Sequence, residues 1–391
     1  MFIQKVTLIN WRNFRSAEAT LQEVTYVLGP NASGKSNFFD ALRFLRDIAK
    51  PTGGGLQTAV IQRGGIKKIR CLHARSPSYV GISIELGDGQ SLQWKYELHF
   101  NLPQRGKKLL LIQKEKVIKV EKDGKEKVIL DRPNKDDDGD ELQLTETYLE
   151  QARTNIKFRE IASFLSGLTY VHLVPQLLKF GEQIGGINLD DDPFGQSFME
   201  RVAKTRKATR AARLRRIDKA LKTIIPHMEE LEFIKDKDTG HPHLEIRFRH
   251  FRPRGAKQRE DQFSDGTLRL IALLWLLQEG GDAPLLLEEP ELSLNEEIVA
   301  EIPQMINSVR RTMKGKKQII ISTHSHALLS NPGIPAEEII ILEPNAEGTS
   351  IRSVDDAELA AMESGFSVAD VVLPNARRVS KRASSQLSLE I

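Results

Sequence analysis

The stretch Gly29-Pro30-Asn31-Ala32-Ser33-Gly34-Lys35-Ser36 decides how the rest of this 391-residue chain is interpreted. Its pattern, G-x-x-x-x-G-K-S, is that of a phosphate-binding loop, in which glycines let backbone N–H groups turn towards an anion. The apolar run Val24–Leu28 before it predicts a buried strand, and Asn37–Ala49 after it has helical spacing. A strand, this loop and a helix in series place the positive end of the helix against phosphates. The sequence therefore predicts a nucleotide site here.

The residues of this loop have separate predicted tasks. Lys35 would place its charge on the β- and γ-phosphates of ATP and act in catalysis, and the hydroxyl of Ser36 would be a ligand for Mg²⁺. We therefore expect ATP and Mg²⁺ as cofactors. The predicted nucleotide contacts of the loop and its helix are Asn31, Ala32, Ser33, Gly34, Lys35, Ser36 and Asn37.

Composition is typical of a cytoplasmic globular protein. Hydrophobic residues make up 40% of the chain and charged residues 28%, both ordinary values. The longest apolar run, Leu270–Leu277, is far shorter than the roughly 20 residues that a membrane span needs, so we expect no membrane contact. The single cysteine, Cys71, suits a reducing cytoplasm. The net charge of +4 is only a weak indication of an anionic partner.

Two further apolar strands also end in residues that can do chemistry. Leu285–Leu287 is followed by Glu288 and Glu289, and successive strand residues point to opposite faces, so the two acids have different predicted roles. Glu288 would hold Mg²⁺, and Glu289 would orient or deprotonate the attacking water. The strand over 318–323 ends at His324, a third catalytic candidate. Because ligands of open α/β sheets bind at the carboxyl ends of strands, these residues should share one site.

A polar stretch opens another apolar helix, over residues 268–277. Either Ser264 or Asp265 can cap this helix, and Gly266 lets its backbone approach a ligand. A helix N-terminus with a free hydroxyl is a second anion site. Ser264 and Gly266 are therefore predicted nucleotide contacts.

Two more nucleotide contacts are predicted on weaker grounds. The strand over residues 2–14 ends in a turn where Arg12 or Phe14 could contact the base, although an exposed arginine at a strand end is an equal alternative. Gln62 stands where a short apolar run meets glycines and could sense the γ-phosphate and Mg²⁺, although a surface position explains it more simply.

Between these two halves lie segments with other patterns. Alternating residues over 78–130 predict antiparallel hairpins. Residues 196–225 predict one long basic helix, with ten Lys or Arg in 201–222 against one acid, Asp218. So one-sided a charge favours contact with DNA phosphates, although a merely solvated helix is an alternative. Near the end, residues 337–342 and 350–354 predict a closing hairpin.

Together these motifs resemble those of the ABC-type ATPases of the SMC, RecF and OLD group. In the order that this group shows, the matching motifs are Walker A at Gly29–Ser36, the signature at Ser264–Thr267, Walker B at Leu285–Glu289, the D-loop region at Pro290–Leu294 and the switch histidine at His324. Two residues depart from the group's pattern. Glu288 stands where aspartate is usual, and Asp265 stands where glycine is usual.

The resemblance implies an α/β fold, a P-loop ABC-ATPase head with a mixed central sheet and an antiparallel β lobe. An α+β insertion would separate Walker A from the signature. We divide the chain into an N-terminal part of the head (1–104), the insertion (105–240), a C-terminal part of the head (241–376) and a disordered basic tail (377–391). Residues 105–240 show no sustained heptads, which argues against the long coiled coil of chromosomal SMC proteins.

The same resemblance implies an ATPase that switches by ATP-dependent pairing of two heads, as a head-to-tail dimer or in a higher oligomer. OLD-like ATPases without a TOPRIM nuclease domain serve anti-phage defence beside a toxic effector, and the residues after 355 are too few for such a domain. We therefore expect a separate effector or nuclease chain as a partner, and DNA as another through 201–222. The alternatives are a RecF-like DNA-repair ATPase and a slowly hydrolysing, nucleotide-gated scaffold.

Overall fold

The computed structural model describes residues 1–103, 109–135, 137, 140–184, 191–225, 227–249, 256–312 and 317–374, without the side chains of residues 182 and 183. The predicted tail, 377–391, lies outside the described residues. In the part of the chain that is described, no helix has the length and apolar character needed to cross a bilayer. Three sheets and the helices between them make up the fold.

The central sheet has six strands in the order β15-β14-β3-β13-β12-β8. The five strands from β14 to β8 run parallel, and β15 pairs antiparallel with β14, so the predicted closing hairpin is confirmed. β3 and β13 are mostly apolar and are buried along their whole length, as expected for parallel strands between two layers. The bounds are β3 Val24–Leu28, β8 Thr169–Val171, β12 Leu285–Glu288, β13 Ile319–Thr323, β14 Ile339–Asn345 and β15 Gly348–Arg352.

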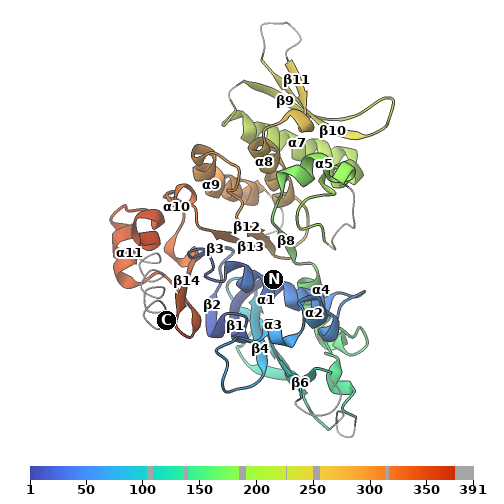
Figure 1. Cartoon of the computed structure of the whole chain (residues 1–391), viewed down its shortest axis with the longest axis vertical. Helices are drawn as coiled ribbons and strands as arrows, with labels where there is room; N and C mark the ends of the chain where they lie inside the picture. The colour runs from blue at the N-terminus through green and yellow to red at the C-terminus, as the bar shows by residue number, and fades with distance from the viewer. Residues whose placement is uncertain are drawn as a thin grey trace, which may run out of the picture.

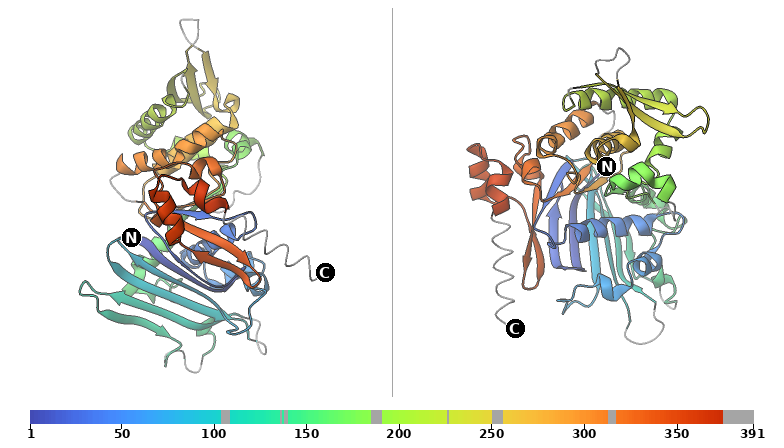
Figure 2. Two further views of the ribbon diagram at one scale, coloured as in Figure 1. Left: turned by 90° about the vertical axis from the view of Figure 1, so that its left-hand side faces the viewer. Right: turned by 45° about the horizontal axis from the view of Figure 1, so that its top comes forward.

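The second sheet is antiparallel, in the order β2-β1-β4-β5-β6-β7, and confirms the hairpins predicted over 78–130. Its bounds are β1 Phe2–Trp11, β2 Phe14–Thr20, β4 Val80–Gly87, β5 Leu92–Asn101, β6 Leu111–Val120 and β7 Glu126–Arg132. The left view of Figure 2 shows this sheet as a broad layer at one end of the molecule. Because β6 pairs with β5 along its length, the sheet continues across residue 104, where the sequence placed the boundary of the insertion.

Helix α1 (Lys35–Ala49) lies between these two sheets (Figure 1). Its side chains Phe38 and Leu42 share one core with both sheets, including Ile320 of β13. The neighbouring residues Ile319 and Ile321 point to the other face of the sheet and enter a second core. That core contains α8 (Asp265–Leu277) and α9 (Glu296–Thr312). The central sheet is therefore covered by helices on both faces, with α1 held firmly beneath the strand ends.

A lobe beyond α8 holds the three-stranded sheet β11-β10-β9 and three helices (Figure 1). Its bounds are β9 Met228–Lys235, β10 Pro242–Phe248, β11 Ala256–Arg259, α5 Pro175–Ile184, α6 Phe198–Lys204 and α7 Lys207–Lys222. The single helix predicted over 196–225 is wrong, because the chain turns out of the helix at Thr205, where ψ is 135°. Arg210 donates to the carbonyls of Val202, Ala203 and Thr205, so one arginine of the second helix satisfies the end of the first.

The remaining helices are short. They are α2 Leu56–Gln62, α3 Ile66–Ile69, α4 Arg159–Ser166, α10 His326–Leu329 and α11 Asp356–Glu363, with 3₁₀ turns at Gln143–Thr145, Asn155–Phe158, Glu260–Gln262 and Ala336–Glu338.

Candidate functional site

The parallel strands of the central sheet bring the predicted site residues to one edge. The loop Gly29–Ser36 leaves the carboxyl end of β3, Glu288 closes β12, and His324 follows β13. Because β3, β13 and β12 are consecutive neighbours and parallel, their carboxyl ends lie side by side. The structure therefore places these residues together, at the edge where ligands bind in such sheets.

The loop has the backbone shape that its glycines and small residues allow. Gly34 has a φ of 100° and Ala32 a φ of 65°, both in the left-handed region that favours glycine. Helix α1 starts at the next residue without a side-chain cap, so the N–H groups of its first turn are donors for an anion. Asn31 and Ala32 are exposed at the mouth of the loop, and Ser33 is buried beneath it. This set of donors fits a nucleotide phosphate.

Lys35 holds the loop together in this structure. Its Nζ donates to the carbonyl oxygens of Gly29, at 2.9 Å, and Pro30, at 3.2 Å. Burial lowers the pKa of Lys35, and the nearby carboxylates of Glu289, Glu291 and Glu288 act against this shift. The amine thus lies among two carbonyl oxygens and three carboxylates, and a phosphate would be its natural partner there.

Two residues that the sequence did not single out form the outer wall of the loop. The amide nitrogen of Asn13 donates to the Ser33 carbonyl, at 3.0 Å, and to the Thr349 hydroxyl, at 2.7 Å. Thr349 in turn donates to the Ser33 carbonyl, and Asn37 donates to Asn13 at 2.8 Å. A Cβ on Gly34 would stand only 2.1 Å from the Asn13 amide, so this wall also requires glycine there. Asn37 therefore supports the loop from the side.

The predicted metal ligands meet each other. The Ser36 hydroxyl donates a short hydrogen bond to Oε1 of Glu288, and the Tyr170 hydroxyl donates to Oε2 of the same carboxylate at 2.5 Å. Burial, followed by the hydrogen bond to Glu288, raises the pKa of Tyr170, which keeps its proton on the ring oxygen. A hydroxyl and one carboxylate are hard oxygen donors, and Mg²⁺ is usually held by one or two carboxylates with phosphate oxygens and waters. The residues fit this ion.

Glu289 lies across from His324. Oε1 of Glu289 is 2.9 Å from Nδ1 of His324, although the two are not aligned as a hydrogen bond. Glu289 has a φ of 44°, a strained conformation for a residue with a side chain, and Arg269 donates to its carbonyl oxygen at 3.0 Å. The side chains of Glu288 and Glu289 thus point in different directions at the end of β12, in line with different roles for the two acids.

A third acid, Glu291, belongs to the same edge and was not predicted as a site residue. Its Oε1 accepts from the Thr323 hydroxyl at 2.6 Å, whereas its Oε2 has no hydrogen-bond partner among the described residues. Burial raises the pKa of this carboxyl. The signal was present in the Pro290–Leu294 stretch, but the burial of its acid, Glu291, depends on tertiary packing.

The structure shows which of the two candidate caps, Ser264 or Asp265, begins α8, the signature helix. Ser264 is the cap, because its Oγ accepts from the Thr267 N–H at 3.1 Å. Asp265 instead pairs with Lys179 of α5 at 2.7 Å and lies 3.4 Å from the Gln176 amide. The acid that replaces the usual glycine is therefore neutralised from α5, while the Ser264 hydroxyl stays exposed at the end of the helix.

Gly266 has a packing role that the sequence did not reveal. A Cβ at this position would lie 2.7 Å from the Ser293 carbonyl oxygen. The glycine thus lets the start of α8 touch the loop that follows Glu289 and Pro290. This contact joins the signature helix to the acids of the site.

Gln176 of α5 was not predicted as a site residue. It follows the carboxyl end of β8, the parallel neighbour of β12, so it leaves the same edge of the sheet. Gln62 lies at the end of α2 and lines a hollow of about 500 Å³ with Arg12 and Asp40.

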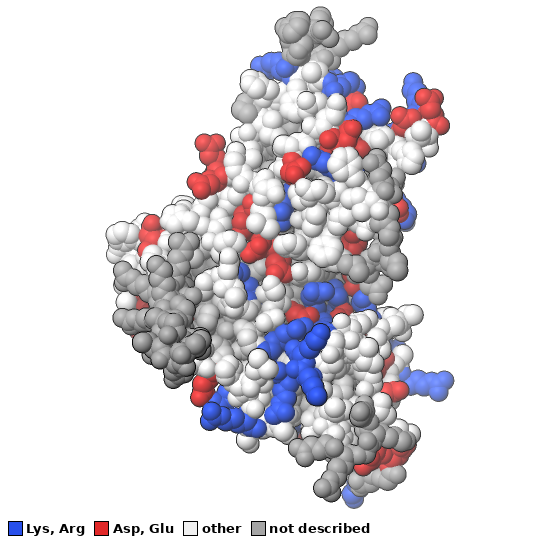
Figure 3. Space-filling view, viewed as in Figure 1, with Lys and Arg blue, Asp and Glu red and all other residues white. Residues whose placement is uncertain are grey.

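Arg12 is partly buried beside the loop and donates to Asp40 at 2.7 Å. It lines a second hollow, of about 650 Å³, together with Ala32, Asn37 and Thr349. Lys67, Lys68 and Arg70 make the wall of this hollow basic, and Figure 3 shows Lys and Arg side chains gathered on this face near α3. The hollow is the space beside the loop into which a nucleotide's base and sugar could extend.

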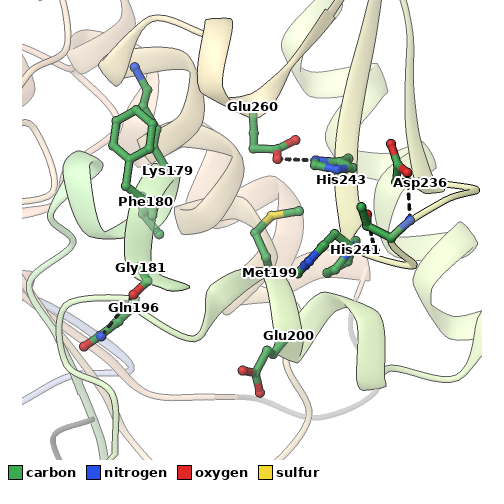
Figure 4. Close-up of a pocket in the computed structure, with 13 residues that line it drawn as sticks. Lys179, Phe180, Gly181, Gln196, Met199, Glu200, Asp236, His241, His243 and Glu260 are labelled. Carbon is green, nitrogen blue, oxygen red and sulfur yellow. Dashed lines mark hydrogen bonds and ion pairs between the residues drawn. The ribbon is translucent and has the colours of Figure 1, made fainter. Parts of the chain in front are cut away.

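A separate hollow of about 500 Å³ lies in the lobe, between α5, α6 and the hairpin β9–β10. Nδ1 of His243 lies 2.6 Å from Oε1 of Glu260, and Figure 4 shows these two side chains facing each other, with Met199 beside His241. Lys179 lines this hollow and also pairs with Asp265, so the hollow adjoins the signature helix.

Comparisons with known proteins agree with this geometry. Residues 24–330 match the family described as "AAA domain, putative AbiEii toxin, Type IV TA system". No curated protein gives a significant match. A solved SMC head bound to the C-winged helix domain of ScpA is 15% identical, with a TM-score of 0.52, covering 92% of this chain and 99% of that one.

A second solved structure supports the same fold. It is an Smc head domain with an extended coiled coil, bound to the C-terminal domain of ScpA derived from Pyrococcus furiosus. It is 12% identical, with a TM-score of 0.50, covering 93% of this chain and 99% of that one. At these identities the likeness shows the fold, an α/β head with mixed sheets. The chain therefore belongs to this AAA domain family and has the fold of an SMC-type P-loop ATPase head.

Proposed function

We propose that the protein binds ATP with Mg²⁺ and hydrolyses it in a site completed by a second copy of the chain. The observation that carries this proposal is that Lys35, Ser36, Glu288, Glu289 and His324 converge at one sheet edge. In contrast, the Ser264 hydroxyl is exposed at the start of α8. A helix N-terminus with an accessible hydroxyl suits the γ-phosphate of a nucleotide held by another head.

Each residue of the site has a task in this proposal. Lys35 leaves the Gly29 and Pro30 carbonyls and places its charge on the phosphates. Mg²⁺, when bound, neutralises charge that develops on the phosphate oxygens. Glu289 accepts a proton from the attacking water, and His324 holds the carboxylate of Glu289 in place.

The first test removes the positive charge of the loop. Lys35→Ala is expected to abolish ATP binding and turnover, because the phosphates lose their fixed cation. Binding of a fluorescent ATP analogue and steady-state phosphate release measure the two effects. The matched control is Lys114→Ala, which removes a lysine that pairs with Glu97 in the antiparallel sheet. A Lys35→Ala protein that binds and hydrolyses ATP like the control would contradict the proposal.

We further propose that this ATPase is a component of a bacterial anti-phage defence system and acts with a separate effector or nuclease chain. The description of its family, which names a putative toxin and a toxin–antitoxin system, supports this role. Phage challenge of bacteria that carry the chain with its neighbouring genes, intact or with Lys35→Ala, tests it. Equal protection by both forms would favour a scaffold over a working ATPase.

We propose DNA binding through residues 201–222, but with fewer basic side chains available for it than the sequence indicated. Six of the ten basic side chains have partners within the chain, such as Glu279 for Arg201 and the Trp275 ring for Arg213. The other four side chains that have such partners are Lys204, Arg210, Arg216 and Lys222. Among the described residues, the four without such a partner are Arg206, Lys207, Arg215 and Lys219.

Reversal of these four charges to glutamate is expected to abolish DNA binding that is independent of sequence and steeply dependent on salt. The reason is that phosphate contacts supply this kind of affinity through counterion release. DNA titrations at several salt concentrations measure the change. The control is a variant in which four of the lysines within residues 114–127 are changed to glutamate, so that its net charge changes by the same amount. If the two variants bind DNA alike, the charges of α6 and α7 serve solubility or a protein partner.

A further inference from the structure

We propose that Tyr170 is a positioning residue that fixes the carboxylate of Glu288, so that a glutamate can hold Mg²⁺ at a place where the related ATPases have aspartate. The inference rests on the proposed function, because it assigns Tyr170 to the metal side of that site. Its observation is the juxtaposition of one carboxylate with two hydroxyl donors, Tyr170 on one oxygen and Ser36 on the other.

The strand register explains how Tyr170 reaches this carboxylate. Tyr170 of β8 stands opposite Leu286 of β12 in the parallel pair. Glu288 is two residues further along β12, so its side chain leaves the sheet on the same face as Leu286. Diagonal neighbours at this separation are within reach of an aromatic side chain. The tyrosine hydroxyl therefore arrives at the end of β12, where an alanine or valine at position 170 would not.

The ring of Tyr170 is itself held by α1. The Phe39 ring meets it edge-on, with centroids 6.5 Å apart, and the Arg43 guanidinium lies 4.2 Å from its centroid. Ser36, Phe39 and Arg43 are three and four residues apart along α1, so they lie on one stripe of the helix. The same stripe thus supplies the second hydroxyl and the packing that fixes the first. Tyr170 is only 8% exposed, which leaves its ring few other positions.

Glutamate needs this support more than aspartate does. Its extra methylene adds a rotatable bond, and ordering a glutamate costs more side-chain entropy. A carboxylate that accepts from Tyr170 on Oε2 presents Oε1 towards Ser36, in one orientation. Hydrogen-bonding partners of metal ligands typically contribute ten- to a hundred-fold in metal affinity. Tyr170 would be such a partner for Glu288.

The experiment measures how much Mg²⁺ is needed for ATP binding. Tyr170→Phe keeps the ring and removes the hydroxyl, so the half-saturating Mg²⁺ concentration should rise about ten- to a hundred-fold. Binding of the nucleotide in EDTA, which depends on the loop and Lys35, should not change. The matched control is Tyr96→Phe, which removes another buried tyrosine hydroxyl that donates to a carboxylate, Glu115, at 3.2 Å in the antiparallel sheet. Tyr96→Phe should leave the Mg²⁺ requirement unchanged.

A double-mutant cycle with Glu288→Asp separates positioning from a general structural effect. The shorter carboxylate withdraws from the Tyr170 hydroxyl, so Tyr170→Phe should have little further effect in the Glu288→Asp protein. An equal rise of the Mg²⁺ requirement in both backgrounds would overturn the inference, as would an unchanged requirement in Tyr170→Phe. Wild-type ATP binding that ignores Mg²⁺ would overturn both the inference and the metal role in the proposed function. Normal Mg²⁺ dependence that Tyr170→Phe leaves intact would overturn the inference alone.

Discussion

Replacement of Glu289 by glutamine is expected to leave ATP binding intact and to lower hydrolysis by about 10²- to 10⁴-fold, the usual contribution of a general base. The amide cannot take a proton from water, but it keeps the size and shape of the carboxylate. Among the described residues, Lys35 and Ser36, which bind the phosphates and Mg²⁺ in our proposal, make no hydrogen bond to this side chain. The loss should therefore appear in kcat and not in the affinity for ATP.

The same variant should collect a closed pair of heads when ATP is present. If ATP joins two heads and hydrolysis separates them, a protein that cannot hydrolyse ATP stays joined. Size-exclusion chromatography with light scattering, with and without ATP, measures this shift in mass. Lys35→Ala is the control that cannot bind ATP and should stay unpaired under both conditions.

Glu288→Gln distinguishes the two neighbouring acids. Glu288 accepts from Ser36 and Tyr170, whereas Glu289 faces His324. Glu288→Gln should thus weaken binding that depends on Mg²⁺. If Glu288→Gln leaves this binding intact while Glu289→Gln destroys it, the roles of the two acids are reversed.

The sequence was sufficient for those parts of the site that are fixed by local pattern and by parallel strands. The loop Gly29–Ser36 is contiguous, and its chemistry follows from its own residues. Glu288, Glu289 and His324 were found because each follows an apolar run, and parallel strands bring such ends to one edge. One rule about strand ends thus placed residues that are far apart in the chain.

Other parts depend on pairings that no local pattern specifies. Asn13 and Thr349 support the loop together although they are separated by most of the chain. The short strand β8 carries Tyr170, and three residues are too few for a recognisable period. Likewise, the sequence predicted hairpins over residues 78–130, but only the pairing of β6 with β5 shows that these hairpins form one antiparallel sheet. Periodicity identifies a strand without naming its neighbour.

The helix break at Thr205 illustrates a different limit. Residues 196–225 contain mostly good helix formers, so propensity favours one continuous helix. The observed end of α6 is stabilised by Arg210, whose guanidinium donates to three carbonyls and stacks on the Phe233 ring at 3.8 Å. Those contacts form only when α7 turns back, so the same arginines that indicated DNA binding include residues that shape the lobe.

Mixing two inactive proteins, Lys35→Ala and Ser264→Arg, is expected to restore ATP hydrolysis. Ser264 is exposed at the start of α8, so arginine can be placed there at the cost of one helix cap, about 1 kcal/mol. The bulky side chain should keep the γ-phosphate held by the facing head away from this helix N-terminus, while the loop and Lys35 of the same chain still bind ATP. When either variant is alone, any pair that it forms therefore contains two defective sites.

A mixed pair differs because two-fold symmetry produces two composite sites. In one of them the intact loop of the Ser264→Arg chain faces the intact signature of the Lys35→Ala chain, and in the other both halves are altered. If pairing is random and the sites work independently, an equal mixture contains about half mixed pairs with one working site each, or about a quarter of the wild-type rate. Steady-state phosphate release measures this recovery as the ratio of the two proteins is varied.

The chain that carries both substitutions is the matched control. Mixed with either single variant, it never brings an intact loop to an intact signature, so no activity should return. Full activity from a wild-type protein shown to be monomeric during turnover would contradict the composite site, because Ser264 of the same chain would then have to serve its own loop. Recovery in the first mixture but not in the control can only arise when Lys35 of one chain and Ser264 of another act on the same ATP.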